Sequence, residues 1–310
     1  MDVSVVIVNW NVREHLDRAL ASVLASGSVP STHLRDIVVV DNASDDGSAE
    51  WVRTRFPEVR LIANTSNLGF AAACNQGFAQ AEADAALLLN PDAELLPGAL
   101  DALVAALEAD PGAAAAGPKL CGADGQPLST RRRFPSLATG FLESTIVQDH
   151  FPELTHLRRY YCEDLPEQAP HEVDWLVGAC LLVRRSALVA VGGLDPRFFM
   201  YFEELDWFLR AHAMGWRALY VPAAQVVHRQ GASSAQVPQL AHLYFAHSKR
   251  VFYAKHFGPL AGWAVHSFLL VSYLLRAVED AAKLALGHRP RFRRERITLF
   301  LSVLQRAARG

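Results

Sequence analysis

Hydrophobic runs alternate with polar ends and helical patterns four times in the first hundred residues. The runs are short and rich in aliphatic side chains, at 3–8, 37–40, 60–63 and 85–89. Polar residues and then apolar residues at helical spacing follow the runs, as in 16–24. Continuous apolar runs are typical of strands buried on both faces, and strands that alternate with helices form parallel sheets. The pattern therefore predicts an α/β fold with a mostly parallel, Rossmann-like sheet and helices on both faces.

Polar residues follow each of these four runs, where the strands would end. They are Asn9, Asp41, the segment 64–67 and the segment 90–92. The carboxyl ends of parallel strands meet at one edge of a sheet, where ligands bind, so these side chains are expected to gather there. Asn and Asp also favour turns and helix caps, which is the simpler interpretation of any one of them. Four such ends together favour a ligand site.

The fourth polar end follows Leu87-Leu88-Leu89 and contains a candidate metal ligand. Pro91 has no N–H for sheet pairing, so the strand is expected to stop before Asp92. A carboxylate at a strand end, without a Lys or Arg beside it in sequence, suits a hard divalent cation. Asp92 also precedes a helical pattern at 97–110, so a helix N-cap is the alternative. The local sequence leaves both interpretations open.

Composition narrows the class of protein. With 310 residues and 51% hydrophobic content the chain can bury a large core, and its net charge of -2 gives no indication of nucleic-acid binding. The four cysteines form no C-x-x-C pair and no secretory leader follows Met1, so we expect reduced thiols and a cytoplasmic location. The sequence also lacks dinucleotide-binding, P-loop, nucleophile-elbow and H-E-x-x-H motifs.

The middle of the chain carries weaker patterns. Residues 118–135 are rich in Gly and Pro and predict loops and short strands. Within them, Arg131-Arg132-Arg133 is expected to form a solvated basic face, with a grip on a phosphate or lipid headgroup as the alternative. Residues 136–170 show little periodicity and predict a mobile or acceptor-shaped insertion.

Three carboxylates follow an aromatic cluster at 198–202. Apolar surroundings raise the pKa of a carboxyl group, which allows it to act as a general base near neutral pH. Asp206 and Arg210 are four residues apart on a predicted helix, which indicates a structural ion pair and leaves Glu203 or Glu204 for the site. The alternative is that all three acids complement the helix dipole.

A histidine ends the second of two short strands predicted at 218–221 and 225–228. His228 would then lie at a strand end, as Asp92 does. A neutral imidazole that binds a metal is one interpretation, and a structural histidine is the other.

The C-terminal part of the chain is helical and basic in its pattern. Residues 240–257 predict a helix with aromatic and cationic side chains, and 260–275 is apolar but shorter than a spanning helix. The segment 289–296 holds five arginines and one glutamate. An interfacial helix beside a basic segment predicts peripheral attachment to the inner membrane surface. A dimer-forming helical pair is the alternative.

Seven short sequence motifs follow one another along the chain in an order that is typical of a known family. They cover about residues 3–232 and are Val5–Asn11, Val38–Ser48, Asn67–Ala71 with Asn75–Gly77, Leu88–Asp92, Gly178–Cys180, Phe202–Asp206 and Val227–His228. This order resembles the family-two nucleotide-sugar glycosyltransferases of GT-A fold, especially the bacterial rhamnosyltransferase-like members. No single stretch is specific, but the seven together are.

The resemblance implies a role for each matching residue. Asn9 and Asp41 would contact the nucleoside of the donor, and Asn67 and Asn75 would lie along its diphosphate. Asp92 would hold the metal as the second aspartate of the family's Asp-x-Asp motif.

His228 would be a further metal ligand, and Glu204 would be the general base. Two positions depart from the family pattern, because Asn90 replaces the first aspartate of Asp-x-Asp and Glu204 replaces the usual Asp of a Glu-Asp pair. A Glu keeps the carboxylate but displaces it by about one methylene, so the position of the base changes more than its chemistry.

The implied activity is that of an inverting glycosyltransferase that depends on a divalent metal, Mg or Mn. It would transfer a sugar, with rhamnose as a candidate, from a dTDP or UDP sugar to a polyprenyl-linked glycan or polysaccharide precursor. The alternative, suggested by the two departures, is a non-catalytic protein of the same fold that binds nucleotide-sugars or acts as a membrane scaffold.

The predicted organisation is a GT-A domain at 1–235 followed by a helical, membrane-associated extension at 236–310. Within the domain, 1–117 would bind the nucleotide and 118–235 the acceptor. The protein is expected in the cytoplasm, peripheral on the inner face of the cell membrane and without nucleic acid as a partner. A homodimer formed through the C-terminal helices is the alternative to membrane attachment.

Overall fold

The computed structural model describes residues 1–26 and 33–307 and divides the chain into two compact units. Unit 1 comprises Met1–Phe134, Tyr161–Phe199 and Glu203–Ser233. Unit 2 comprises Pro135–Tyr160, Met200–Phe202 and Ser234–Gly310. The last segment of unit 2 starts close to the division predicted at residue 235. The structure differs from that prediction because two earlier segments also belong to the helical unit.

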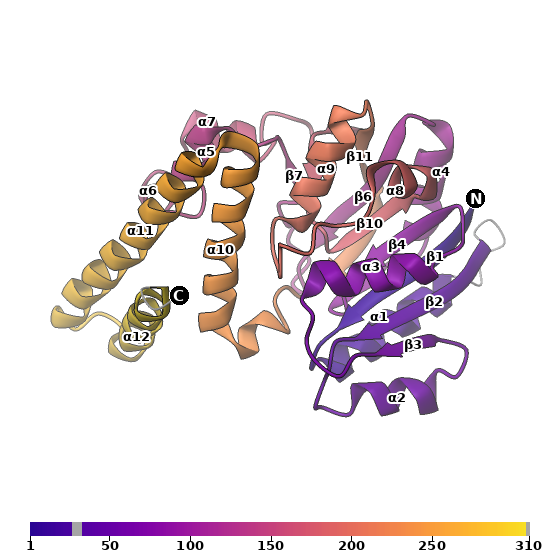
Figure 1. Ribbon diagram of the computed structural model, residues 1–310, viewed down its shortest axis with the longest axis horizontal. Coiled ribbons are helices and arrows are strands. Elements are labelled where there is room, and N and C mark those ends of the chain that lie inside the picture. The colour runs from indigo at the N-terminus through magenta and orange to yellow at the C-terminus, as the bar shows by residue number, and fades with distance from the viewer. Residues whose placement is uncertain (27–32, 308–310) are drawn as a thin grey trace. The chain divides into compact units, whose positions relative to one another are not determined.

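Unit 1 is built on a nine-stranded mixed sheet (Figure 1). Its strands are β1 (Asp2–Asn9), β2 (His33–Asp41), β3 (Arg60–Ala63), β4 (Ala85–Leu89), β5 (Ala93–Leu95), β6 (Ala113–Cys121), β8 (His171–Val173), β10 (Cys180–Arg184) and β11 (Arg217–His228). A separate pair consists of β7 (Arg131–Arg132) and β9 (Trp175–Leu176).

The sheet has the order β3-β2-β1-β4-β10-β6-β11-β5, with β8 also paired to β11. Strands β1 to β4 are parallel, β10 is antiparallel to both β4 and β6, and β11 is parallel to β6. Six strands therefore run in one direction and three in the other. The predicted α/β class with a mostly parallel sheet is confirmed.

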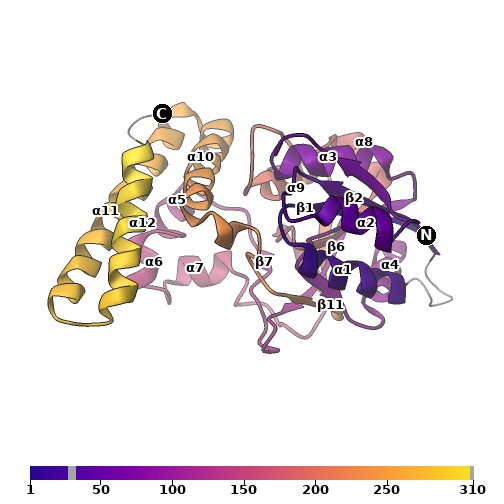
Figure 2. The ribbon, with the colours of Figure 1, turned by 90° about the horizontal axis from the view of Figure 1, so that it is seen from below.

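Helices cover both faces of this sheet (Figure 2). They are α1 (Arg13–Ser26), α2 (Ser48–Arg55), α3 (Phe70–Gln80), α4 (Ala99–Ala109), α8 (Arg185–Val191) and α9 (Glu203–Ala213). Side chains of a strand point alternately to its two faces. Val5 and its neighbours two residues away therefore join the core beneath α1 and α4, whereas Val6 meets α3 on the other face.

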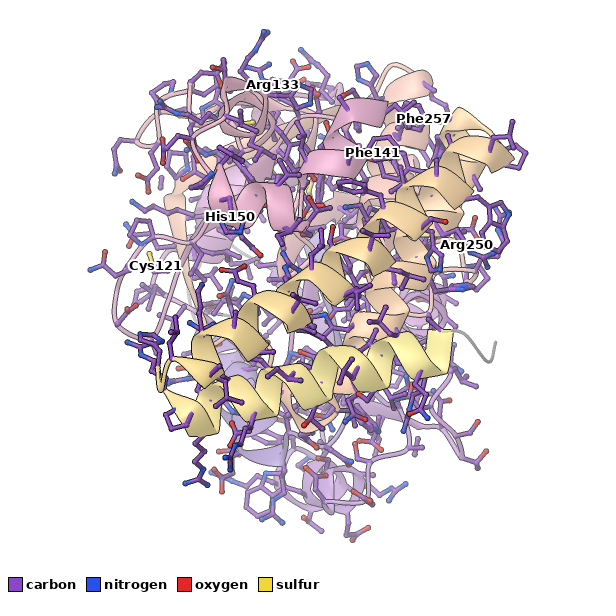
Figure 3. All side chains as sticks on the ribbon, turned by 90° about the vertical axis from the view of Figure 1, so that its left-hand side faces the viewer. Cys121, Arg133, Phe141, His150, Arg250 and Phe257 are labelled. Carbon is purple, nitrogen blue, oxygen red and sulfur yellow. The ribbon has the colours of Figure 1, made fainter. Side chains whose placement is uncertain are left out.

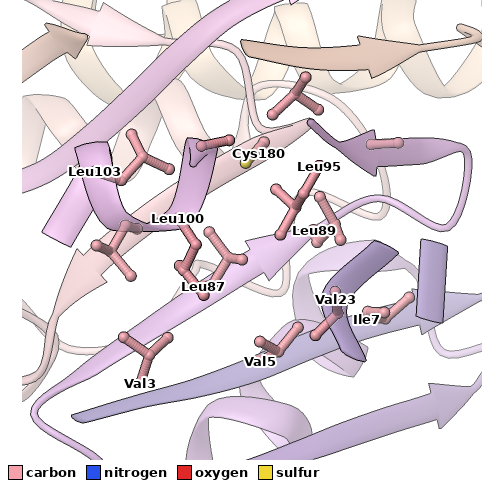
Figure 4. Close-up of a cluster of buried hydrophobic side chains, with 14 of the residues drawn as sticks. Val3, Val5, Ile7, Val23, Leu87, Leu89, Leu95, Leu100, Leu103 and Cys180 are labelled. Atoms are coloured by element: carbon pink, nitrogen blue, oxygen red, sulfur yellow. The ribbon is translucent and has the colours of Figure 1, made fainter. Parts of the chain in front are cut away.

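The main core lies between the sheet and α1, α2 and α4 (Figure 4). Figure 4 shows Val3, Val5 and Ile7 of β1 with Leu87 and Leu89 of β4, Val23 of α1, and Leu100 and Leu103 of α4. All of these side chains are buried. This packing fixes the register of β1 and β4, and with it the place where each strand ends.

The four polar strand ends lie at one edge, as predicted. Asn9 is level with Asp41 in the register of β1 and β2, Asp41 is level with Ala63 of β3, and Ile7 is level with Leu89 of β4. His228 ends β11 at this same edge, since it pairs with Ala93 just after Asp92.

Two local expectations change. Helix α4 begins at Ala99 after an N-cap at Gly98, so Asp92 is not a helix cap and lies in the turn between β4 and β5. The strands predicted at 218–221 and 225–228 are one strand, β11, whose pairing with β6 shifts register between Val221 and Gln225. A strand can stay continuous through such an irregularity.

Unit 2 is helical. It contains α5 (Leu137–Leu142), α6 (Ile146–His150), α7 (Thr155–Tyr160), the short 3-10 turn η1 (Ser234–Gln236), α10 (Pro238–Phe257), α11 (Pro259–Ala285) and α12 (Pro290–Ala307). The insertion predicted at 136–170 thus holds three short helices. They are too short to show helical periodicity, and Ser136 and Thr145 cap two of them through their hydroxyls.

The core of unit 2 lies between its three long helices. Leu269, Tyr273 and Ala277 of α11 pack with Phe300 and Val303 of α12, and Ala246 of α10 joins this cluster. The rings of Tyr273 and Phe300 are stacked with centroids 5.6 Å apart. Lys249 is buried in the same unit, and its Nζ lies 3.2 Å from Glu143 Oε2.

Candidate functional site

The ends of β1 and β2 are joined by a buried polar network. Asn9 Nδ2 donates to Asp41 Oδ1 at 2.9 Å and to Ser44 Oγ at 3.1 Å. The backbone N–H of Ser44 donates to the other carboxylate oxygen of Asp41 at 3.0 Å. Asn9 is fully buried and Asp41 nearly so. The structure therefore places Asn9 as a support that orients the Asp41 carboxylate.

The loop from β3 to α3 is organised by asparagines. Asn42 Nδ2 donates to Asn67 Oδ1 at 2.8 Å, and Asn42 Oδ1 accepts from Asn64 Nδ2 at 3.1 Å. Asn67 Oδ1 also accepts from the N–H of Gly69 at 3.0 Å. Asn67 is thus held at the sheet edge, in the loop that leads into α3.

Asn75 lies on α3, and its side-chain amide hydrogen-bonds to the backbone of a residue distant in sequence. Its Nδ2 donates to the carbonyl of Leu194 at 2.7 Å, and its Oδ1 accepts from the N–H of Leu194 at 2.8 Å. Any side chain at Gly193 would collide with it, since an added Cβ would lie 2.4 Å from Asn75 Oδ1. The structure gives Asn75 a positioning role for the segment before α9.

Asp92 and His228 meet at the sheet edge and are both nearly buried. Asp92 Oδ1 lies 3.2 Å from His228 Nε2, and Asp92 Oδ2 accepts from the N–H of Ala232 at 3.2 Å. Neither ring nitrogen of His228 makes a hydrogen bond of good geometry within the described part of the chain. Burial alone would raise the pKa of Asp92, but the neighbouring His228 and the Ala232 N–H outweigh it and hold that pKa below its ordinary value.

These two side chains fit a divalent cation as a partial ligand set. A carboxylate beside an imidazole with unpartnered buried nitrogens supplies two ligands, and buried polar atoms normally have a partner. Within the described residues no group of three or more His, Cys, Asp and Glu side chains could hold a metal. A cation here would need further oxygen ligands from a diphosphate or water, which is usual for Mg²⁺.

The segment after His228 folds back over this edge. Ser233 Oγ donates to the carbonyl of Trp10 at 2.9 Å, just beyond the end of β1. Arg229 Nε and Arg18 Nε lie 3.0 and 3.3 Å from the same oxygen of Glu94. The shared Glu94 carboxylate therefore ties the segment after His228 to β5 and α1.

Glu203 and Glu204 open α9 in surroundings without a cationic partner among the described residues. Glu203 is buried, and one carboxylate oxygen of each residue has no hydrogen-bond partner in the described structure. Glu204 Oε1 accepts from the N–H of Gly178 at 3.2 Å. Burial raises the pKa of Glu203, and the adjacent Glu204 raises it further. Burial also raises the pKa of Glu204, while backbone N–H groups oppose that rise.

Two adjacent carboxyl groups without a counter-charge, one buried and one partly buried, cannot both ionise at low energetic cost. The proton is held more strongly by Glu203, since its pKa is raised well above the ordinary range. Glu204 is left as the group that ionises more readily, and its Oε2 has no hydrogen-bond partner in the described structure. This arrangement suits the general base that the sequence pattern indicated.

Asp206 takes the structural role predicted for it. Its carboxylate accepts from Arg210 Nε at 2.9 Å, and the same guanidinium donates to the carbonyls of Val191 and Gly193, each at 2.7 Å. Asp206 is fully buried, so the pair fixes α9 against the end of α8.

The arginine triplet is engaged within unit 1. The guanidinium carbon of Arg131 lies 4.9 Å from the ring centre of Tyr220, and that of Arg132 lies 4.6 Å from that of Tyr161. Arg133 forms an ion pair with Asp164 at 2.9 Å. The three arginines therefore hold neighbouring loops together. The sequence had predicted a solvated basic face or a phosphate-binding or lipid-binding role for them, and neither prediction included these contacts.

Sequence reasoning missed the groups that hold these side chains in place. Ser44 and Gly178 both lie in stretches that carry the family resemblance. Only the fold shows that Ser44 orients Asp41 and that Gly178 orients Glu204. The backbone N–H of Ala232 carries no side-chain signal at all.

Known proteins share the sequence pattern of this chain. Residues 4–192 match the family model described as glycosyl transferase family 2. The chain is 35% identical over 288 residues to N-acetylglucosaminyl-diphospho-decaprenol L-rhamnosyltransferase of Mycobacterium tuberculosis, across 87% of this chain and 92% of that protein. Rhamnosyltransferase WbbL of Escherichia coli is 38% identical over 85 residues, which are 27% of this chain and 26% of that protein.

Two solved structures share the fold at lower identity. Mannosyltransferase PcManGT of Pyrobaculum calidifontis, solved with GDP-Man and Mn2+, has a TM-score of 0.54 at 18% identity and matches 99% of this chain and 86% of that one. GalNAc-T7, solved with UDP, GalNAc and Mn2+, has a TM-score of 0.55 at 17% identity and matches 82% of this chain and 51% of that one. The resemblance to a GT-A glycosyltransferase is confirmed.

Proposed function

The chain belongs to glycosyl transferase family 2, and from that premise we propose that it transfers a sugar, with inversion, from a nucleotide-diphospho-sugar to a polyprenyl-linked glycan. The proposal rests on the environment of the Glu204 carboxylate. One oxygen of this carboxylate accepts from the Gly178 N–H, the other is buried without a hydrogen-bond partner in the described structure, and burial favours proton uptake by the group.

The reaction follows from the chemistry of this carboxylate. Glu204 takes the proton from an acceptor hydroxyl as that oxygen attacks the anomeric carbon, and the bond from this carbon to the nucleoside diphosphate breaks on the opposite face. A single displacement of this kind inverts the configuration and needs one base and one stabilised leaving group.

The donor diphosphate is proposed to lie at the Asp92 edge of the sheet, with Asp41, held in place by Asn9, toward the nucleoside and Asn67 in the loop that leads into α3. Asp92 and His228 would hold a divalent cation, Mg or Mn, which neutralises charge on the leaving diphosphate when bound. The solved structures of similar fold contain Mn2+ together with nucleotides, which supports this assignment.

The acceptor and the sugar are proposed from a relative that aligns over most of the chain. The Mycobacterium tuberculosis relative is named as a rhamnosyltransferase that acts on a decaprenol-linked N-acetylglucosaminyl diphosphate. We propose a similar lipid-linked acceptor here, with rhamnose as the sugar and dTDP or UDP as its carrier. Such an acceptor would place the protein on the cytoplasmic side of the membrane as a peripheral protein.

A second candidate is a non-catalytic nucleotide-sugar-binding or scaffold protein. It is favoured by Asn90, which occupies the first position of the family's Asp-x-Asp motif and whose Oδ1 is buried without a partner in the described structure. A protein that binds nucleotide-sugars without turnover would retain the donor edge and need no base at residue 204.

Two measurements separate these functions. Calorimetry with UDP and dTDP, each with and without Mg or Mn, should show metal-dependent binding of one nucleotide, and Asp92→Asn should weaken it. Turnover of that nucleotide's sugars with a polyprenyl-linked acceptor should fall about 10²-fold or more in Glu204→Gln, with nucleotide binding retained. Glu204→Asp restores the family's usual residue and should keep more activity than Glu204→Gln. Binding without turnover in the unmodified protein would support the second candidate, and no binding at all would remove both.

A further inference from the structure

Helix α11 has two faces of different character. One face packs inside unit 2 through Val265, Leu269, Tyr273 and Ala277, all of which are buried. This face also holds Asp280, which is buried and paired with Arg293 and Arg296 of α12. The apolar residues on this face of α11 are therefore buried by packing within unit 2.

The opposite face is exposed along the whole helix, and we call it the outer stripe. It recurs every three or four residues and consists of Leu260, Trp263, Ala264, Ser267, Val271, Leu274, Leu275, Val278, Ala281, Ala282 and Ala285, with Leu286 at the C-cap. Leu260 is 85% exposed, Val278 59% and Trp263 57%. None of these residues is charged, and Ser267 is the one polar side chain among them.

Such a stripe is unusual on a surface exposed to water. Single exposed apolar residues are normal, but a continuous apolar stripe over seven helical turns indicates a partner. By length and composition α11 is the one helix in the described residues that could cross a membrane. Its inner face makes a crossing unfavourable, because that face is packed on α10 and α12 and includes the buried Asp280. A helix of this kind lies in the plane of a membrane surface.

Charges around the stripe indicate the nature of that surface. Near its start, the guanidinium of Arg250 lies 4.8 Å from the ring centre of Trp263, and Figure 3 labels Arg250 on α10. Beyond its end, Arg289, Arg291 and Arg294 are exposed. Arg291 is 95% exposed and has only a long contact, 3.4 Å, with Glu295.

Two acids next to the stripe are neutralised within unit 2, and the exposed Glu295 of the basic segment has a long contact with Arg291. Asp280 is held by two arginines of α12, and Glu279 is paired with Lys283 and lies 3.3 Å from His150. The segment predicted as basic is thus divided: Arg293 and Arg296 serve the fold, and the other three arginines are available to an external anion. The apolar outer stripe and the three exposed arginines are together suited to binding a membrane with anionic headgroups.

We propose that the outer stripe of α11 is buried in the headgroup and upper acyl region of an anionic phospholipid bilayer, with Arg289, Arg291 and Arg294 on its phosphates. This inference deepens the proposed function, on which it rests for the lipid-linked acceptor, by naming the surface that docks the enzyme beside that acceptor. The other conceivable occupant of the stripe, a second copy of the chain, is an outcome of the test.

The test compares sedimentation of the full-length protein with vesicles of phosphatidylcholine alone and of equal parts phosphatidylcholine and phosphatidylglycerol. The triple variant Val271→Ser, Leu274→Ser, Val278→Ser should lower binding to both vesicles at least about tenfold. The triple variant Arg289→Gln, Arg291→Gln, Arg294→Gln should lose the preference for the anionic vesicle, about tenfold or more, and its salt dependence.

Matched controls lie in unit 1, where Val189 and Met214 are 74% and 56% exposed. Val189→Ser with Met214→Ser removes apolar surface away from the stripe and should leave vesicle binding unchanged. All of these positions are exposed, so the variants should unfold at the same temperature as the parent protein. A parent protein that fails to bind vesicles, or stripe variants that bind as well as the parent, would overturn the proposal.

Two further readouts separate the possible failures. A parent dimer in light scattering that becomes a monomer in the stripe variant would assign the stripe to a second copy and overturn the membrane proposal. Nucleotide binding, and turnover with a short water-soluble acceptor, should be unchanged in both triple variants. Vesicle binding without any turnover would reject the proposed function and leave the membrane surface standing.

Discussion

Single residues in this protein act through hydrogen bonds that the rest of the chain supplies. Glu204 is held by a backbone N–H, Asp41 by Asn9 and Ser44, and Asp92 by Ala232. Each candidate group therefore has a fixed orientation before a ligand arrives, which is the usual requirement of a catalytic site.

Glu203 offers a prediction at this scale, because burial keeps it protonated in the folded protein to a higher pH than in the unfolded chain. As pH rises above the ordinary pKa of a glutamate, the unfolded state ionises first and folding becomes less favourable. Glu203→Gln removes this loss. We expect the variant to gain on the order of 1 kcal/mol or more over the parent at pH 8 and much less at pH 5, measured by urea unfolding.

Glu172, which is exposed on β8, provides the control. Glu172→Gln should follow the parent protein at both pH values. An equal gain for Glu203→Gln at pH 5 and pH 8 would show that the carboxyl is not protonated in the fold.

At the scale of elements, close packing explains why some positions hold a residue that has no chemical role. Gly77 stands on α3 within one of the stretches that carried the family resemblance, yet it has no side chain to bind a ligand. An added Cβ would lie 2.2 Å from Val6 Cγ1 of β1. The glycine is needed because the helix and the strand approach one another there.

Gly77→Ala should therefore destabilise the protein by about 1–3 kcal/mol despite the better helix propensity of alanine. Val6→Ala removes the colliding methyl groups, so the double variant should lose less stability than the sum of the two single variants. Urea unfolding of the four proteins measures this coupling. Strict additivity would mean that α3 and β1 are not in contact at this point.

At the scale of the whole molecule, each compact unit has its own hydrophobic core. The residues proposed for the donor and the base all belong to unit 1, whereas the outer stripe belongs to unit 2. The proposed lipid attachment and the proposed sugar transfer are thus assigned to different compact units of the chain.

Phe300→Ala tests this division, since Phe300 is buried in the core of unit 2 and stacks on Tyr273. Loss of the ring should destabilise unit 2 by about 3–5 kcal/mol and lower the temperature of one calorimetric transition. Binding of the nucleoside diphosphate should be retained.

Leu100→Ala makes the corresponding change in the core of unit 1 and should impair nucleotide binding near its own transition. If Phe300→Ala abolished nucleotide binding at a temperature where the protein is still folded, the assignment of the two functions to separate units would be wrong.

The sequence by itself determined the first four strands of unit 1, the helices between them and the edge where ligands would bind, but it did not reveal β5, β6 and β8. Strand and helix periods are local properties, and parallel strands joined by helices must end at the same side of the sheet. Asn9, Asp41 and Asp92 could therefore be placed together from their positions after apolar runs. The apolar composition of 260–275 also predicted a helix there, and this segment lies within α11.

Only the tertiary structure decided which distant groups meet. Asp92 and Ala232 are 140 residues apart, and Asn75 and Leu194 are 119 residues apart. Neither pairing follows from local pattern, because it depends on how β11 and the segment before α9 return to the sheet. The short helices of 136–160 and the exposed face of α11 were likewise decided by packing. Which face of a helix is buried depends on the partners that cover it, and these are known only once the chain has folded.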